Sequence, residues 1–481
     1  MKPANLLIIC SDEHARSALG CYGNRIVRTP NLDRLAAGGV RFTNAYTPSP
    51  ACVPARASMA TGRYVHEIGT WSSAEPYRGS PTGWGHRVMS QGRRVVSIGK
   101  LHYRSTEDAN GFEPEILPMH VLDGIGWTLG LQRTQPLPAY DAPIEFADDV
   151  GPGESAYTRY DRNVLAAALN WLREDGTQGD GIPWVLFVSF VAPHYPLRAP
   201  QPFFDLYADT ELGEPLHPHS VQRNEHPVLR GLADFYDYDR HFSDDTRRIA
   251  RQAYYGLCSF LDDNIGRLID ALEDNRLSSN TRVLYLTDHG EMLGDHGFWT
   301  KCVMYENSVA VPMILSGPGV PKGIKTDTPV SLIDVGATVL EALGIPTAEK
   351  GAGPGISLFT SIDSPDPDRV IFSEFHDGGA ITGVFMVRWD RWNYVHYVGY
   401  PPQLFNIEDD PTEGEDLGRD PTYAEIRKTC VAKLRAIVDP DQASAQAFTD
   451  QKARLAELKA AGLLSAKRDF GFTPPQLNDG S

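Results

Sequence analysis

The chain has 481 residues, of which 41% are hydrophobic and 22% are charged, as in an ordinary globular protein. This length suits one large α/β domain with a smaller appendage, or two domains. The net charge of −17 at pH 7 argues against nucleic acid and anionic membranes as partners, because both would be repelled.

The chain opens with a short apolar run, Asn5–Cys10, which we interpret as a buried strand. It is too short for the apolar part of a signal peptide, and no cleavage site follows it. No segment approaches the roughly 20 apolar residues that span a bilayer. The six cysteines are scattered, with neither zinc-site spacing nor a disulfide framework. We therefore predict a cytoplasmic protein.

Short β-branched runs then alternate with longer helical patterns, which is typical of βαβ units around a mostly parallel sheet. The predicted strands are apolar on both faces, as strands covered by helices should be; they are Leu6–Ile9, Val95–Ile98, Val185–Phe190, Val283–Thr287 and Met313–Leu315. The main helices expected between them are Asn31–Ala37, Asn163–Arg173 and Arg251–Leu272. The fold class is thus α/β, with a mixed, mostly parallel central sheet flanked by helices.

A stretch rich in Gly, Pro and Ser, Gly344–Pro367, marks the end of the main domain. Three strand-like runs follow without helices between them and predict a small antiparallel sheet: Val370–Phe375, Val384–Trp389 and Trp392–Tyr397. Two helices in Tyr423–Leu464 and a polar tail, Phe470–Ser481, end the chain. We divide the chain into a catalytic α/β domain (1–360), an α+β subdomain (361–422) and a helical extension (423–481). The helices pack either on another subunit of a homo-oligomer or on their own domain.

Unusual polar residues follow four of the predicted strands. Asp12-Glu13-His14 ends the first, Lys100 and His102 the second, His194 the third, and Asp288-His289 the fourth. Because ligands of open α/β sheets bind beyond the carboxyl ends of the strands, we predict one shared site.

Asp12, Asp288 and His289 suit a divalent metal, since they combine hard oxygen ligands with one imidazole. The alternative is that each aspartate only caps a helix. Glu13 is a further candidate ligand. The single imidazole favours Mn²⁺, with Ca²⁺ as the second choice.

The segment Cys52-Val53-Pro54-Ala55-Arg56 predicts the start of a helix, with Pro54 in its first turn. Backbone N–H groups at such a position favour an anion, and we expect them to favour a thiolate at Cys52. Cys-x-Pro-x-Arg resembles the signature of the sulfatase family. Asp12, the Lys100–His102 pair, His194, Asp288-His289 and Lys301 resemble further positions of that family, in the same order.

The resemblance implies an alkaline-phosphatase-like fold and the oxidation of Cys52 to formylglycine by a separate enzyme. The hydrated formylglycine, beside the metal, would then hydrolyse a small aryl or alkyl sulfate to an alcohol and inorganic sulfate. Arg56, Lys100 and Lys301 would neutralise charge, His194 would protonate the leaving oxygen, and His102 would accept a proton from the second hydroxyl group.

The branch that this sequence most resembles holds choline sulfatase and the phosphonate monoester hydrolases. Trp127 resembles a choline-contacting tryptophan, although it could equally be a core residue. Lys100 and His102 stand where phosphonate monoester hydrolases have a Tyr/Thr-rich segment, which favours sulfate esters. A phosphonate monoester or phosphodiester hydrolase, or a non-enzymatic anion-binding protein, is the alternative.

Overall fold

The computed structural model describes residues 2–138, 140, 142–178, 181–218, 226–346, 353–464 and 473. Its centre is an eight-stranded sheet with the order β11-β2-β10-β9-β1-β7-β4-β5. The bounds are β1 (Asn5–Asp12), β2 (Gly39–Phe42), β4 (Val95–Lys100), β5 (Glu115–Met119), β7 (Val185–Pro193), β9 (Thr281–Thr287), β10 (Met313–Ser316) and β11 (Ile324–Thr326).

Parallel pairing joins β9, β1, β7, β4 and β5, whereas β10 runs antiparallel to both β9 and β2. Every residue of β1, β4, β7 and β9 is buried, as expected for strands covered on both faces. The predicted mixed, mostly parallel sheet is therefore confirmed. Sequence reasoning missed β2, β5 and β11, which are the short strands toward its two edges.

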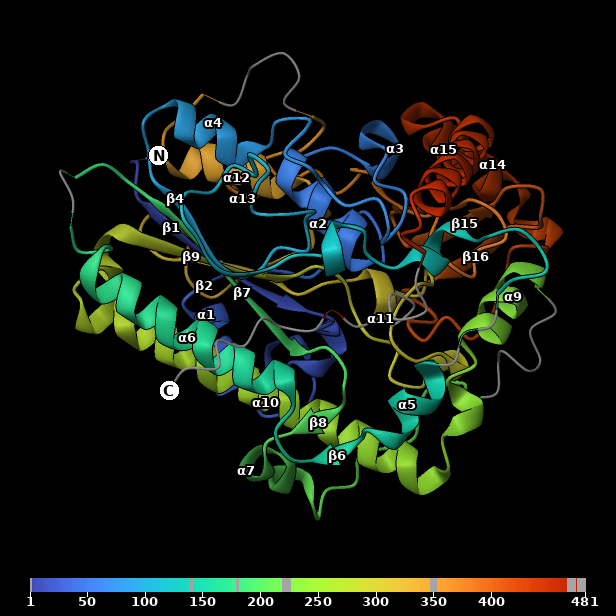
Figure 1. The fold of residues 1–481 in the computed structure, drawn as a ribbon, viewed down its shortest axis with the longest axis horizontal. Helices are drawn as coiled ribbons and strands as arrows, with labels where there is room; N and C mark the ends of the chain where they lie inside the picture. Colours follow the sequence, from blue (N-terminus) through green and yellow to red (C-terminus); the bar gives the residue numbers. More distant parts are fainter. Residues whose placement is uncertain are drawn as a thin grey trace.

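Helices cover both faces of this sheet (Figure 1). One layer contains α1 (Pro30–Ala37), α6 (Ala156–Glu174) and α10 (Asp244–Asp274); the other contains α2 (Cys52–Thr61), α4 (Trp84–Ser90), α12 (Asp334–Ala342) and α13 (Leu358–Asp363). Each layer buries its own apolar core against the sheet. The predicted helices correspond to α1, α6 and α10, and the last begins seven residues earlier than expected, at Asp244.

Shorter elements fill the connections: β3 (Ala45–Tyr46), α3 (Val65–Ile68), α5 (Ala142–Asp148), β6 (Gly151–Pro152), β8 (Arg198–Ala199), α7 (Gln201–Phe204), α9 (Pro227–Tyr236), α11 (Glu306–Val309) and β12 (Val330–Ser331). Within the ranges given above, no helix is both long enough and apolar enough to cross a membrane.

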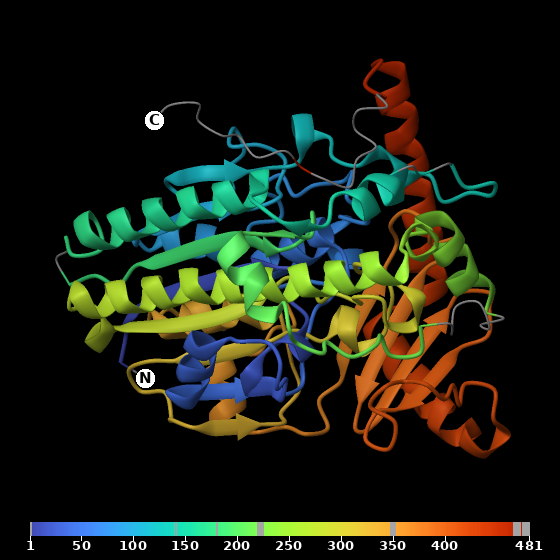
Figure 2. The same cartoon turned by 90° about the horizontal axis from the view of Figure 1, so that it is seen from below.

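The second sheet is antiparallel and stands at one end of the main sheet (Figure 2). Its strands are β13 (Ile371–Phe375), β14 (Val384–Trp389), β15 (Trp392–Tyr397) and β16 (Gln403–Asn406), so the three predicted strands are confirmed and a fourth joins them. The two predicted helices are α14 (Ala424–Ile437) and α15 (Pro440–Ala460).

Buried residues of α14 pack on the second sheet, and Leu458 of α15 packs on Ala74, Ile125 and Leu131. Packing on the chain's own domain thus accounts for these buried side chains. The homo-oligomer and the three-part division of the chain stay predictions. Residues 347–352 of the predicted domain boundary, and the predicted tail apart from Thr473, lie outside the described residues.

Candidate active site and metal centre

The four strands that end in unusual polar residues are neighbours in the sheet, in the order β9-β1-β7-β4. Because all four are parallel, their carboxyl ends reach the same edge, and the side chains that follow them meet there. Gly99 lets β4 turn into this edge: its φ is +103°, and a side chain at this position would collide with the backbone carbonyl of Ser189.

Helix α2 begins at Cys52 and brings it to the same edge. Arg56, one turn later, is fully buried and bridges two strand ends. Its Nε donates to Asp288 Oδ2 at 2.7 Å, and its Nη2 donates to Asp12 Oδ2 at 3.0 Å. Its Nη1 donates to the carbonyl of Lys100 and to Ser189 Oγ. Arg56 therefore uses its donors to hold the strand ends together.

Four buried side chains converge closely enough to hold a metal ion. One ligand atom from each of Asp12, Cys52, Asp288 and His289 lies within 4.8 Å of the other three. Cys52 Sγ is 3.1 Å from His289 Nε2, and that nitrogen is 3.7 Å from Asp288 Oδ1. Two carboxylates and an imidazole are a suitable donor set for a divalent cation.

Glu13 lies beside this group and points toward two cationic or basic side chains. Its Oε2 is 3.1 Å from Lys301 Nζ and 3.3 Å from His194 Nε2. Burial, and the nearby Glu291, raise the pKa of Glu13 to about 8 although Lys301 opposes this. Glu13 also forms a second group of possible ligands with Asp12 and His194.

Lys301 and His194 form a hydrogen-bonded pair. Lys301 Nζ lies 2.9 Å from His194 Nε2, and His194 Nδ1 lies 2.7 Å from the carbonyl oxygen of Tyr195. Since a carbonyl only accepts, Nδ1 carries the hydrogen and Nε2 accepts from the lysine. Burial and the Lys301 charge hold the pKa of His194 well below its usual value. A resting imidazolium at His194 is therefore disfavoured.

The surroundings of Asp12 and Cys52 shift the pKa values of these two groups in opposite directions. Burial opposes ionisation of Asp12, but the charges of Lys100 and Arg56 hold its pKa well below the usual value. Burial and the Asp12 charge raise the pKa of Cys52 to about 12. The expected thiolate at Cys52 is thus wrong for this arrangement, because desolvation and a neighbouring carboxylate outweigh the helix N-terminus.

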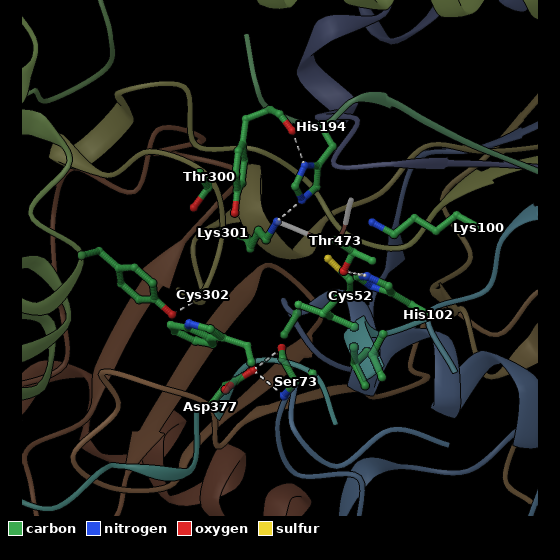
Figure 3. A pocket seen from close by; sticks show the side chains of 18 of the residues that line it. Cys52, Ser73, Lys100, His102, His194, Thr300, Lys301, Cys302, Asp377 and Thr473 are labelled. Atoms are coloured by element: carbon green, nitrogen blue, oxygen red, sulfur yellow. Dashed lines mark hydrogen bonds between the residues drawn. The ribbon is translucent and has the colours of Figure 1, made fainter. Parts of the chain in front are cut away.

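Figure 3 shows Cys52, Lys100, His102, His194 and Lys301 around one pocket. Lys100 Nζ is 2.6 Å from Asp12 Oδ2, yet it is buried and makes no well-oriented hydrogen bond within the described residues. His102 Nε2 is 2.9 Å from Thr473 Oγ1. Burial and the charges of Lys100 and Arg56 lower the pKa of His102 far below its usual value, which favours a neutral imidazole.

Four aromatic side chains that pack against one another form one wall of this pocket: Trp127, Tyr140, Tyr236 and Tyr238. Tyr157 and Tyr195 also line the pocket, and their rings contact that of His194. The Trp127 ring lies 5.5 Å from Tyr140 and 6.4 Å from Tyr236, measured between centroids. Trp127 therefore lines the pocket and also packs against other rings.

Asp377 completes this wall and accepts hydrogen bonds from Ser73 N and Oγ at 2.8 and 2.6 Å. Sequence reasoning missed Asp377, Thr473 and the tyrosines. Asp377 follows a predicted strand, Val370–Phe375, as the other site residues do, so this signal was present in the sequence. The strand, however, belongs to the second sheet.

A model of the sulfatase family matches residues 4–345, and a model of the C-terminal part of N-sulphoglucosamine sulphohydrolase matches residues 294–439. The chain belongs to the sulfatase family. The sulfatase family lies within the alkaline phosphatase superfamily, and this sulfatase is a sulfuric ester hydrolase with a buried cysteine in a group able to hold a metal.

This sulfatase is 30% identical over 474 residues to choline-sulfatase of Rhizobium meliloti (strain 1021), covering 95% of this chain and 87% of that protein. It is 29% identical over 477 residues to arylsulfatase K of Danio rerio, with coverage of 95% and 87%. The phosphonate monoester hydrolase of Agrobacterium radiobacter has the same fold, with a TM-score of 0.74, 22% identity and coverage of 90% of this chain and 95% of that one.

Proposed function

We propose that this sulfatase hydrolyses a small aryl or alkyl sulfate ester to an alcohol and inorganic sulfate. The observation that carries the proposal is the meeting of Cys52 with Asp12, Asp288 and His289 at one buried point. A nucleophile formed at position 52 would start in contact with the groups that hold the metal. Such pre-arrangement removes much of the entropic barrier to attack.

Asp12, Asp288, His289 and the side chain at position 52 would hold one divalent cation, with Mn²⁺ expected first and Ca²⁺ second. When bound, this cation supplies Lewis acidity and neutralises negative charge. Formylglycine, made from Cys52 by a separate modifying enzyme, supplies the nucleophilic oxygen and allows sulfate to leave without attack by water on sulfur.

Two lysines provide the remaining positive charge. Lys100 and Lys301 both line the pocket, and the ammonium of Lys100, which pairs with Asp12, has further N–H groups that would bind a sulfuryl oxygen. Arg56 has committed its donors to Asp12, Asp288, Lys100 and Ser189, so we assign it to holding the strand ends. Charge stabilisation of this kind is often the largest contribution to catalysis.

Proton transfers are assigned to two histidines. We propose that the leaving oxygen is protonated by the Lys301–His194 pair, in which Nζ lies 2.9 Å from Nε2. Because the neutral form of His102 is favoured, this imidazole is suited to accept the proton that must leave position 52 before sulfate is released.

The alcohol part of the ester would lie against Trp127 and the tyrosines. A quaternary ammonium group is the candidate that the site favours, since aromatic faces and the Asp377 carboxylate both attract cations. The relationship to choline-sulfatase of Rhizobium meliloti supports the same candidate. Sulfate esters with an uncharged aryl group suit the rings but gain nothing from the carboxylate.

The test uses full-length protein whose residue 52 is verified as formylglycine by peptide mass. We expect turnover of 4-nitrophenyl sulfate and of choline sulfate to exceed that of a 4-nitrophenyl phosphonate monoester by at least about tenfold in kcat/KM. Cys52→Ala should abolish turnover, whereas Cys430→Ala, at a buried thiol on α14, should not. A preference for the phosphonate would reject the proposed substrate class in favour of the phosphonate alternative.

A further inference from the structure

Strand β7 bulges just before it delivers His194. Its partner β1 pairs Cys10 with Ser189 and then Asp12 with Pro193, so two steps along β1 correspond to four along β7. The register with β4 ends at Ser189. Residues 190–192 consequently have no partner in either neighbouring strand of the sheet. Buried backbone N–H groups in such a bulge need acceptors from elsewhere.

Asp161 supplies acceptors for two of these three residues, Val191 and Ala192. It belongs to α6 and is fully buried. Its Oδ1 accepts from the N–H of Val191 and its Oδ2 from the N–H of Ala192, each at 2.8 Å. The carbonyl of Val191 in turn accepts from the N–H of His194 at 3.0 Å. A continuous set of hydrogen bonds therefore runs from the α6 carboxylate to the backbone of His194.

The same helix also contacts the His194 ring. Tyr157 lies four residues before Asp161, which places both on one face of α6. The centroid of the Tyr157 ring lies 5.9 Å from that of His194, with the ring planes nearly perpendicular. Helix α6 thus fixes His194 at two points, the backbone before it and the imidazole itself.

We infer that Asp161 is a positioning residue of the active site, which sets the His194 imidazole against Lys301. The inference rests on the proposed function, in which the Lys301–His194 pair protonates the leaving oxygen. Asp161→Asn replaces one acceptor oxygen with an amide that faces a backbone N–H, so the bulge must shift and carry His194 with it.

A displaced proton donor should matter most for esters whose alcohol leaves poorly. We expect Asp161→Asn to lower kcat/KM roughly 100-fold for an unactivated alkyl sulfate. For 4-nitrophenyl sulfate, whose leaving group needs little protonation, the loss should stay below about tenfold. A purely structural role would lower both in equal proportion.

Asp262 offers a matched control. It is also a buried carboxylate on a helix, α10, and it also accepts from two consecutive backbone N–H groups, those of Asn31 and Leu32, at 3.0 and 2.8 Å. Asp262→Asn should lower the melting temperature to a similar extent and leave the ratio of alkyl to aryl turnover unchanged. If Asp161→Asn is not obtained as folded protein, Asp161→Glu displaces the same two oxygens by one methylene group.

A double-mutant cycle with His194→Ala completes the test. Once His194 is absent, Asp161→Asn should cause no further selective loss on the alkyl ester. A full, additive loss in that background, or an equal loss on both esters, would overturn the inference. If the wild type prefers phosphonates, the proposed function fails, and the same cycle with alkyl and aryl phosphonate monoesters still tests Asp161.

Discussion

Arg56 joins the two carboxylates of the candidate metal site. It is the buried cation that pairs with both Asp12 and Asp288, and the exposed fractions of these side chains are at most 1%. Removing one partner of a buried ion pair leaves an uncompensated charge in a medium of low polarity. Here two carboxylates would lose the same guanidinium at once.

We predict that Arg56→Met lowers the free energy of unfolding by on the order of 3–5 kcal/mol in the presence of a chelator, measured by urea denaturation. A divalent cation should restore part of the loss, because it neutralises the same carboxylates. Arg34→Met removes an exposed pair with Asp270 and should cost less than about 1 kcal/mol. If Arg56→Met loses no more free energy of unfolding than Arg34→Met, Arg56 does not hold the strand ends together.

Among the elements, α15 supports the aromatic wall of the pocket from behind. Leu458 packs on Ile125 and Leu131, the residues that flank the Trp127 segment. Gln451 accepts from the buried guanidinium of Arg133 at 3.0 Å, close to the same segment. A helix from the end of the chain therefore helps to place a wall of the substrate pocket.

We predict that Leu458→Ala raises KM for the sulfate ester several-fold while kcat changes little, because the cavity lets the Trp127 segment move without touching Cys52. Leu434→Ala makes a comparable cavity in α14 under the second sheet. Both variants should lose roughly 2–5 kcal/mol of stability by urea denaturation. Equal KM values in the two variants would show that α15 does not support the pocket.

At the scale of the whole molecule, a buried Glu374 joins the second sheet to α3 and to the segment that leads to Cys52. Its Oε1 accepts from His66 N and Nδ1, and its N–H donates to the carbonyl of Pro48. Burial alone would raise the pKa of Glu374, but His66 and His376 lower it to about 2. Charge pairing thus contributes to holding the second sheet against α3.

The pKa values of Glu374 and His66 determine how the free energy of unfolding changes with pH. A carboxyl whose pKa falls from 4.5 to about 2 on folding stabilises the protein above pH 4.5, and the contribution disappears as the pH falls toward 2. The full contribution is about 3 kcal/mol. The raised pKa of His66 has the opposite sense: its contribution is present below pH 6.5 and is lost at higher pH.

We predict that Glu374→Gln lowers the free energy of unfolding at pH 7 and flattens its decline between pH 4.5 and 2, measured by urea denaturation at each pH. Glu408→Gln, in an exposed pair with Arg391, should leave the curve within about 1 kcal/mol of the wild type. An unchanged slope in Glu374→Gln would reject the ion pair as the source of acid sensitivity.

The sequence by itself determined the elements whose signals are local. The β-branched runs, the helix start at Cys52-Val53-Pro54 and the polar residues directly after four strands are each encoded within a few neighbouring positions. Parallel pairing then brings Asp12, Lys100, His194 and Asp288 to one edge, because the carboxyl ends of such strands coincide.

Only the tertiary structure decided which other residues line the pocket at that edge and how they change the pKa values of the site residues. Thr473 reaches the pocket from near the end of the chain, and no local pattern specifies that contact. Asp377 follows a predicted strand, but only the packing of the second sheet brings it to the pocket. The direction of Glu13 and the raised pKa of Cys52 arise from side chains packed around them. Spacing along a chain encodes periodicity, whereas desolvation and charge depend on all neighbours in space.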